Sequence, residues 1–134
     1  MSRCCQAKFD LLIDGLSDDV SFGWALIHLG IRDNPPVQDS PPSGEMIARA
    51  FEHFERLVHL GLVNIGRIEF IDPDQPPNTV GPVRHIAEPL APVRRRVDHA
   101  CSADGDSIDW QFSCWLVNTE AGDAAARLAI LERP

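Results

Sequence analysis

Apolar residues at helical spacing predict two helices in the first part of the chain. Over residues 6–16, four apolar side chains fall on one side of a helix and two aspartates fall on the other. Residues 22–30 are apolar on nearly every side, and Ser21 can cap the start of this segment. We therefore expect a second, mostly buried helix that includes Trp24. A proline-rich loop is predicted over residues 32–42.

The strongest helical pattern follows this loop and ends at a glycine. Either Ser40 or Ser43 can cap it, and its apolar residues fall within an arc of about 120° when each residue advances by about 100°. Gly61 can adopt the left-handed conformation that ends a helix. Residues 62–71 then alternate as in a strand, with a break at 66–67. The core face of this third helix consists of Ile47, Ala50, Phe51, Phe54, Leu57 and Val58.

The second half of the chain is predicted to hold a helix, a strand and a last helix. After another proline-rich loop over residues 72–82, apolar residues at helical spacing predict a helix over about 90–101. The alternation over residues 109–117 predicts a strand in which Trp110 and Trp115 point to opposite faces. The last helix has Asn118 or Thr119 as its cap and Ala121, Ala125, Leu128 and Leu131 on its apolar side.

The predicted elements fit one α+β domain over residues 1–134. A chain of 134 residues, of which 44% are hydrophobic, is long enough to form one core. We expect about five helices and a small antiparallel sheet of two or three strands.

Two stretches resemble parts of winged-helix proteins. Residues 51–65, with Leu-Gly-Leu-Val at 60–63, resemble the recognition helix and the first wing strand. Residues 115–122, Trp-Leu-Val-Asn-Thr-Glu-Ala-Gly, are similar to the returning strand and the entry into a terminal helix. As a whole the chain also resembles a group of small actinobacterial winged-helix-like proteins of unassigned function. The resemblance implies a winged-helix-like fold with inserts at 32–42 and 72–108, and DNA binding through the third helix.

The charge of the chain favours a basic partner over a polyanion. Twenty acidic residues against twelve basic ones give a formal net charge of -8, which opposes binding to nucleic acid or anionic lipid. The longest apolar stretch, residues 22–31, is too short to span a bilayer, and the start of the chain is not typical of a signal peptide. With only four cysteines, a reducing cytoplasm is the simplest compartment.

The outward face of the third helix is the main candidate site. It carries Glu45, Glu52 and Glu55, and we expect Arg49 and Arg56 to pair with the glutamates four residues before them. Insertion into a DNA groove needs cations that are free to contact phosphates. Three glutamates on this face therefore favour a protein partner, which is expected to be basic.

We interpret the chain as a non-catalytic binding or regulatory protein, for example an immunity factor that neutralises a basic toxin. The expected partner-binding residues are Trp115 and the three glutamates, because at least one tryptophan of the predicted strand needs cover outside the main core and can mark a partner or homodimer interface. The alternative is a DNA-binding transcriptional regulator that uses Arg49, Arg56 and the wing residue Arg67.

The sequence predicts neither a metal site nor a cofactor. His99, Cys101 and Cys114, with one of His53, His59 or His85, are the residues that could assemble a zinc site, but they lack the paired spacing of zinc ligands. Buried, unliganded cysteines are the better interpretation. The run Arg94 to Arg96 cannot face one ligand, because three consecutive residues fan across about 200° of a helix.

Overall fold

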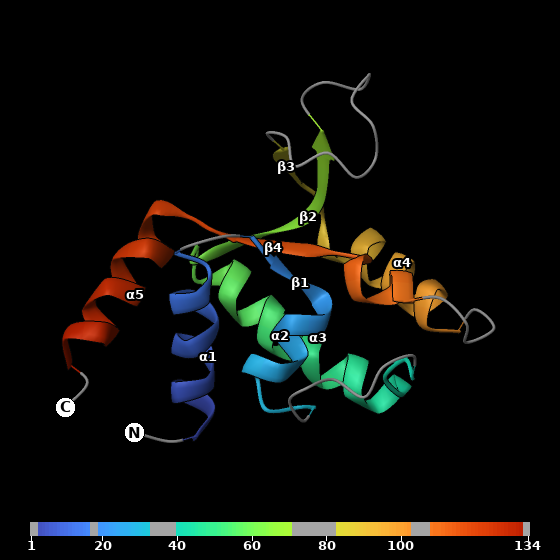
Figure 1. Ribbon diagram of the computed structural model, residues 1–134, viewed down its shortest axis with the longest axis horizontal. Helices are drawn as coiled ribbons and strands as arrows, with labels where there is room; N and C mark the ends of the chain where they lie inside the picture. Colours follow the sequence, from blue (N-terminus) through green and yellow to red (C-terminus); the bar gives the residue numbers. More distant parts are fainter. Residues whose placement is uncertain (1–2, 17–18, 33–39, 71–82, 103–107, 133–134) are drawn as a thin grey trace.

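The computed structural model describes residues 3–16, 19–32, 40–70, 83–102 and 108–132. In these ranges the chain forms five α-helices and one four-stranded antiparallel sheet (Figure 1). The elements are α1 (Arg3–Asp14), β1 (Val20–Ser21), α2 (Phe22–His28), α3 (Gly44–His59), β2 (Val63–Phe70), β3 (Val83–Ala87), α4 (Leu90–Ser102), the 3₁₀ helix η1 (Ile108–Phe112), β4 (Trp115–Asn118) and α5 (Glu120–Glu132).

The α+β class and the five helices are confirmed, whereas the predicted sheet was too small. Strands β1 and β3 were not predicted, because two and five residues give little alternation to detect. Most of the first predicted proline-rich loop and all of the second lie outside the described residues. Within the described part of the chain, no helix is long and apolar enough to cross a bilayer.

Local signals place α2 and α3 where the sequence predicts them. The Ser21 hydroxyl accepts a hydrogen bond from the Trp24 amide at 3.3 Å, and the Ser43 hydroxyl accepts one from the Met46 amide at 3.2 Å. Gly61 has a φ of +73°, so the left-handed stop of α3 is confirmed. On the predicted core face of α3, five residues are buried and Val58 is partly buried.

Helix α2 is buried on fewer sides than its composition suggests. Phe22, Ala25 and Leu26 lie in the core, but Trp24 is 50% exposed, with its ring centroid 6.2 Å from that of His28. The prediction of a buried Trp24 was wrong. An apolar residue on every side of a short helix does not reveal which sides meet other elements. Helix α2 meets α1, β1 and η1, and through Phe22 it also meets α3.

The sheet has the strand order β1-β4-β2-β3, so the late strand β4 lies inside it. Leu116 of β4 pairs with Val20 on one side and with Ile65 on the other. Strand β2 is continuous: its first half pairs with β4 and its second half pairs with β3. Gly66 lies at the change and pairs with both Trp115 and Ala87. The predicted break was therefore wrong, and its glycine marks the point where β2 changes partner. Together β2 and β3 project from the body of the molecule (Figure 1).

The predicted strand over 109–117 is split in two. Its first part forms η1, which is closed by hydrogen bonds from the Ser113 amide and hydroxyl to the Trp110 carbonyl oxygen at 3.2 and 2.6 Å. Trp110 is 1% exposed, and its ring packs edge-on against Phe22 at 6.3 Å. Trp110 and Trp115 therefore do not share a strand, and the predicted strand was wrong in its first part. The alternation of apolar and polar residues did not reveal the turn at 113.

The core lies where the helices meet the sheet. Helix α5 packs against this core with a different side from the one that the sequence predicts. The Thr119 hydroxyl accepts a hydrogen bond from the Gly122 amide at 3.0 Å and so caps α5, as predicted. The predicted apolar side of α5 was wrong, because Gly122 and Ala126 are buried whereas Leu128 and Leu131 are exposed. A Cβ at Gly122 would overlap the carbonyl oxygen of Leu62, which shows how closely this side of α5 approaches the backbone.

Candidate partner-binding face of α3

The outward face of α3 is held in place by the aromatic residues on its inward face. Phe51 and Phe54 pack edge-on at 5.1 Å, and both rings contact Phe22 of α2, at 6.4 and 6.2 Å. This packing fixes the rotation of α3 about its axis. The residues of the sequence-predicted site on this helix are all exposed: Glu45, Arg49, Glu52, Glu55 and Arg56.

The expected ion pairs within α3 are not formed. In the part of the chain that the structure describes, no carboxylate oxygen lies within 4.0 Å of the Arg49 or Arg56 guanidinium. Exposed pairs four residues apart contribute only about 0.3–0.5 kcal/mol, which is too little to immobilise two long side chains. The prediction that neighbouring carboxylates neutralise these arginines was wrong.

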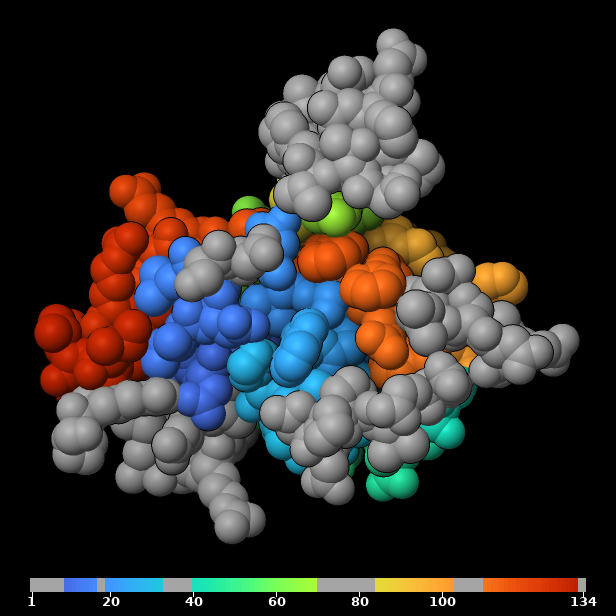
Figure 2. Space-filling view, viewed as in Figure 1, coloured from blue at the N-terminus to red at the C-terminus, as the bar shows by residue number. Residues whose placement is uncertain are grey.

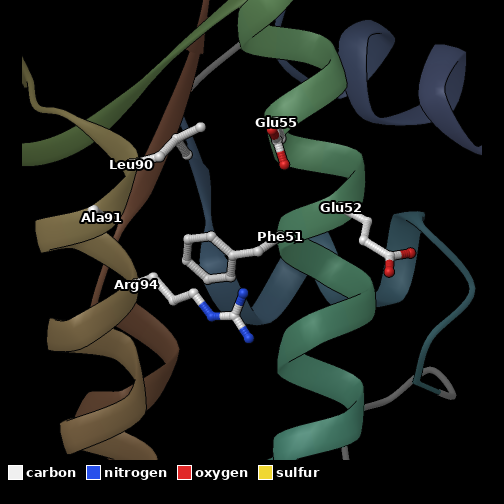
Figure 3. Close-up of a pocket in the computed structure, with 6 residues that line it drawn as sticks. All are labelled: Phe51, Glu52, Glu55, Leu90, Ala91 and Arg94. Atoms are coloured by element: carbon white, nitrogen blue, oxygen red, sulfur yellow. The ribbon is translucent and has the colours of Figure 1, made fainter.

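Two hollows adjoin this face of α3. One, of about 450 Å³, is lined by Glu52, Glu55, Arg56 and His59. The other, of about 250 Å³, lies between α3 and α4, and its described lining consists of Phe51, Glu52, Glu55, Leu90, Ala91 and Arg94 (Figure 3). Glu52 and Glu55 border both hollows, and this shared acidic edge distinguishes them from the other residues of α3.

Among the described residues that line the second hollow, Arg94 of α4 is the cation, and its guanidinium lies over an aromatic ring. The guanidinium carbon of Arg94 lies 5.8 Å from the Phe51 ring centroid, and its Nε lies 4.0 Å from the Asp98 carboxylate. Figure 3 shows Phe51 reaching toward α4, whereas the Glu52 carboxylate points away from α4. Among the described residues, neither Glu52 nor Glu55 has an ion-pair partner. Two like charges three residues apart are thus left uncompensated.

Trp115 lies on the sheet and apart from these hollows. Its ring is half-buried and stacks on Phe112, with centroids 5.7 Å apart and an interplanar angle of 16°. The His85 Nε2 lies 3.0 Å from the Trp115 carbonyl oxygen, within hydrogen-bonding distance. Trp115 is not among the described residues that line either hollow, so the structure does not bring it together with the three glutamates. The Phe112 ring covers part of the Trp115 ring, for which the sequence did not indicate a neighbour.

The wing residue Arg67 belongs to a charge network at the junction of β2, β3 and α4. Its guanidinium lies 3.1 Å from Glu69 and 3.3 Å from Glu88, and these carboxylates raise the pKa of Arg67. The same Glu69 lies 3.4 Å from Arg84. Arg67 on β2 is therefore paired with carboxylates, whereas Arg49 and Arg56 on α3 have no ion pair among the described residues.

The centre of this network, Glu88 with Arg96, was not predicted as a unit. Both carboxylate oxygens of Glu88 accept hydrogen bonds from Arg96, at 2.9 and 3.0 Å, and Arg96 Nε donates to the Ser113 carbonyl oxygen at 2.7 Å. The hydrogen bonds from Arg96 are the main cause of the lowered pKa of Glu88. Glu88 lies between β3 and α4 whereas Arg96 lies within α4, so the periodicity of no single element pairs them.

The described residues contain no group of three histidines, cysteines or carboxylates placed to hold a metal ion. Burial raises the pKa of the Cys101 thiol to about 11, with a smaller contribution from Asp98. Burial also raises the pKa of Cys114. Both thiols are therefore protonated at neutral pH, and a metal ion would have to displace these protons to bind.

Comparisons with known proteins add no relative to this picture: no protein-family model, no curated protein and no solved structure matches the chain.

Proposed function

We propose that this protein is a non-catalytic, acidic, winged-helix-like binding protein whose α3 binds a basic segment of a protein partner. The observation that carries the proposal is the acidic edge formed by Glu52 and Glu55. Both side chains are exposed, both border two hollows, and neither has an ion-pair partner in the described ranges. Arginine or lysine side chains of a partner can enter these hollows and pair with the carboxylates.

The order of the elements supports the winged-helix-like part of the proposal. Along the chain, β1 lies between α1 and α2. Strand β4 follows α2, α3 and α4 in the chain, and in the sheet it lies between β1 and β2. In this interpretation α3 takes the place of a recognition helix, β2 and β4 are the wing strands next to it, and residues 72–108 are an insert that includes β3 and α4. The insert places α4 beside α3 and thereby creates the second hollow.

The charge of the whole chain favours the same partner chemistry. At a formal net charge of -8, long-range attraction accelerates encounters with a cationic surface and opposes encounters with a polyanion. A regulatory or immunity-type role, in which the protein neutralises a basic partner, is the form of binding that these features fit.

A basic peptide tests the acidic edge directly. We expect a fluorescent nonapeptide of alternating arginine and leucine to bind the protein, and Glu52→Gln with Glu55→Gln to weaken binding about tenfold, since each exposed ion pair contributes up to about 1 kcal/mol. Fluorescence anisotropy measures the affinity. Glu120→Gln changes one exposed charge on α5 and is the matched control, with at most a twofold effect expected. Equal weakening by Glu120→Gln would show that net charge alone attracts the peptide and would reject the site.

The alternative function, DNA binding by a transcriptional regulator, is favoured by two observations. Arg49 and Arg56 have no ion pair among the described residues, and β2 with β3 projects from the body of the molecule, where it is accessible to a large ligand (Figure 1). The paired state of Arg67 and the acidic edge oppose it.

Titration with a random DNA duplex at several salt concentrations separates the two functions. We expect no binding even at low ionic strength, because the three glutamates face the same way as Arg49 and Arg56. Binding that falls steeply with salt, and that Arg49→Ala with Arg56→Ala abolishes, would establish the regulator and overturn the protein-binding proposal.

A further inference from the structure

Helix α5 carries an apolar stripe on the side that faces away from the core. Ala121, Ala124, Leu128 and Leu131 are all exposed, Leu128 at 59% and Leu131 at 81%. Their spacing of three, four and three residues is that of the seam positions of a coiled coil. The four residues form one exposed apolar stripe along the helix, and contiguous exposed apolar surface of this kind marks an interaction site.

The buried residues of α5 confirm that this stripe is a second surface and not a misplaced core face. Gly122 and Ala126 are buried and Ala125 packs against the core, and the centre of this side lies about 130° around the helix from the stripe when each residue advances by about 100°. Helix α5 packs against α1 and β4 with its inner side. In Figure 2 the atoms of α5, in red, stand along one edge of the visible face, beside those of α1 in blue.

The charged residues that flank the stripe specify a partner. With the stripe at the seam, Arg127 takes the flanking position before Leu128, and Glu132 takes the one after Leu131. In a parallel pair of identical helices these two positions face each other across the seam, so that Arg127 of each copy meets Glu132 of the other. Both side chains are exposed and have no ion pair among the described residues. An antiparallel pair would instead place Arg127 against Arg127.

We infer that the stripe on α5 is the interface of a homodimer, in which two copies of the chain pack their α5 helices in parallel about a twofold axis. The occupant of the apolar face is thus a second copy of this chain, because the same helix supplies both the seam and the complementary charges. The inference does not depend on the proposed function of α3, which lies on a different surface. A dimer of this kind would present two acidic edges to a partner.

Sedimentation equilibrium of the full chain tests the dimer. We expect the apparent mass to rise from one chain toward two between about 1 and 100 µM, as for a weak dimer whose population follows mass action. Leu128→Glu with Leu131→Glu should hold the mass at one chain throughout this range. Leu60→Glu is the matched control, since Leu60 follows the last residue of α3 and is 60% exposed, and this variant should dimerise as the parent chain does. Because all three leucines are exposed, far-UV circular dichroism should be unchanged in these variants.

Charge reversal tests the orientation. Arg127→Glu and Glu132→Arg should each raise the dissociation constant about tenfold, and the two changes together should restore it, because each reversal replaces two attractive pairs by two repulsive ones. Unchanged dimerisation of Arg127→Glu would reject the parallel arrangement, since Arg127 facing its own copy would only exchange one pair of like charges for another. A single-chain mass for the parent protein at 100 µM, or dimerisation that survives both leucine changes, would overturn the interface itself.

Discussion

Replacing Gly66 with alanine is expected to lower the free energy of unfolding by about 3 kcal/mol or more. A Cβ at this position would overlap the carbonyl oxygen of Ile86, which is backbone and cannot rotate away. Relief requires β3 to move away from β2, and Gly66 is also where β2 passes from β4 to β3. The strain therefore falls on the one strand that joins the projecting hairpin to the sheet.

Urea unfolding of Gly66→Ala, monitored by tryptophan fluorescence, measures this loss. Gly44→Ala is the matched control, because a Cβ at Gly44 meets nothing within 4 Å and Gly44 begins α3. Alanine there should leave stability unchanged or raise it by up to about 1 kcal/mol. Equal stability of the Gly66→Ala variant and the parent chain would contradict the close approach of β3 at this position.

Removal of the Glu88 charge is expected to destabilise the fold by about 2 kcal/mol at pH 7. Glu88 accepts two hydrogen bonds from Arg96, and its side chain is only 15% exposed, so Glu88→Gln removes a largely buried anion and leaves the half-buried Arg96 guanidinium without its charge partner. The Arg96 Nε also holds the Ser113 carbonyl oxygen at the end of η1. The change should therefore loosen both α4 and the turn that leads into β4.

The same pair makes the stability of the protein depend on pH. The hydrogen bonds from Arg96 place the pKa of Glu88 in the folded protein below its ordinary value of 4.5. The stabilisation is thus complete above the pKa of the unfolded chain and is lost as the pH falls through the lowered pKa of the folded state. We expect the difference in unfolding free energy between the parent chain and Glu88→Gln to shrink steadily below about pH 4.5.

Unfolding by urea at pH 7 and at several acidic pH values checks both parts of this prediction. Glu52→Gln removes a carboxylate that has no ion pair in the described part of the chain, and it should change stability by less than about 0.5 kcal/mol. A constant difference between the parent chain and Glu88→Gln at all pH values would contradict the assigned role of the Glu88 charge.

The helices of this protein could be predicted from sequence because their signals are local. The Ser21 and Ser43 caps, the positive φ of Gly61 and the inward face of α3 depend on residues within about four positions of each other. The exposed positions of Glu45, Glu52 and Glu55 follow from the same periodicity. For α5 the cap followed from the sequence, but the choice between its two apolar sides did not.

Most of the missed features depend on contacts between distant parts of the chain. The five-residue strand β3 exists because β2 offers it an edge, and η1 replaces the start of a predicted strand because Trp110 fits against Phe22. The arginines of α3 are unpaired because weak local pairs do not outweigh side-chain freedom. The second hollow required α4 to lie beside α3, which periodicity within either helix does not reveal.

By itself, the sequence determined the α+β class, the position of α3 and its stop, and an acidic surface on that helix, since each depends on residue type and short spacing. Only the tertiary structure decided which side of α5 is buried, that Glu88 and Arg96 join β3 to α4, and that Glu52 and Glu55 border two hollows. The physical reason is that close packing selects among faces that are equally apolar or equally charged in the sequence, and this selection depends on every neighbouring element at once.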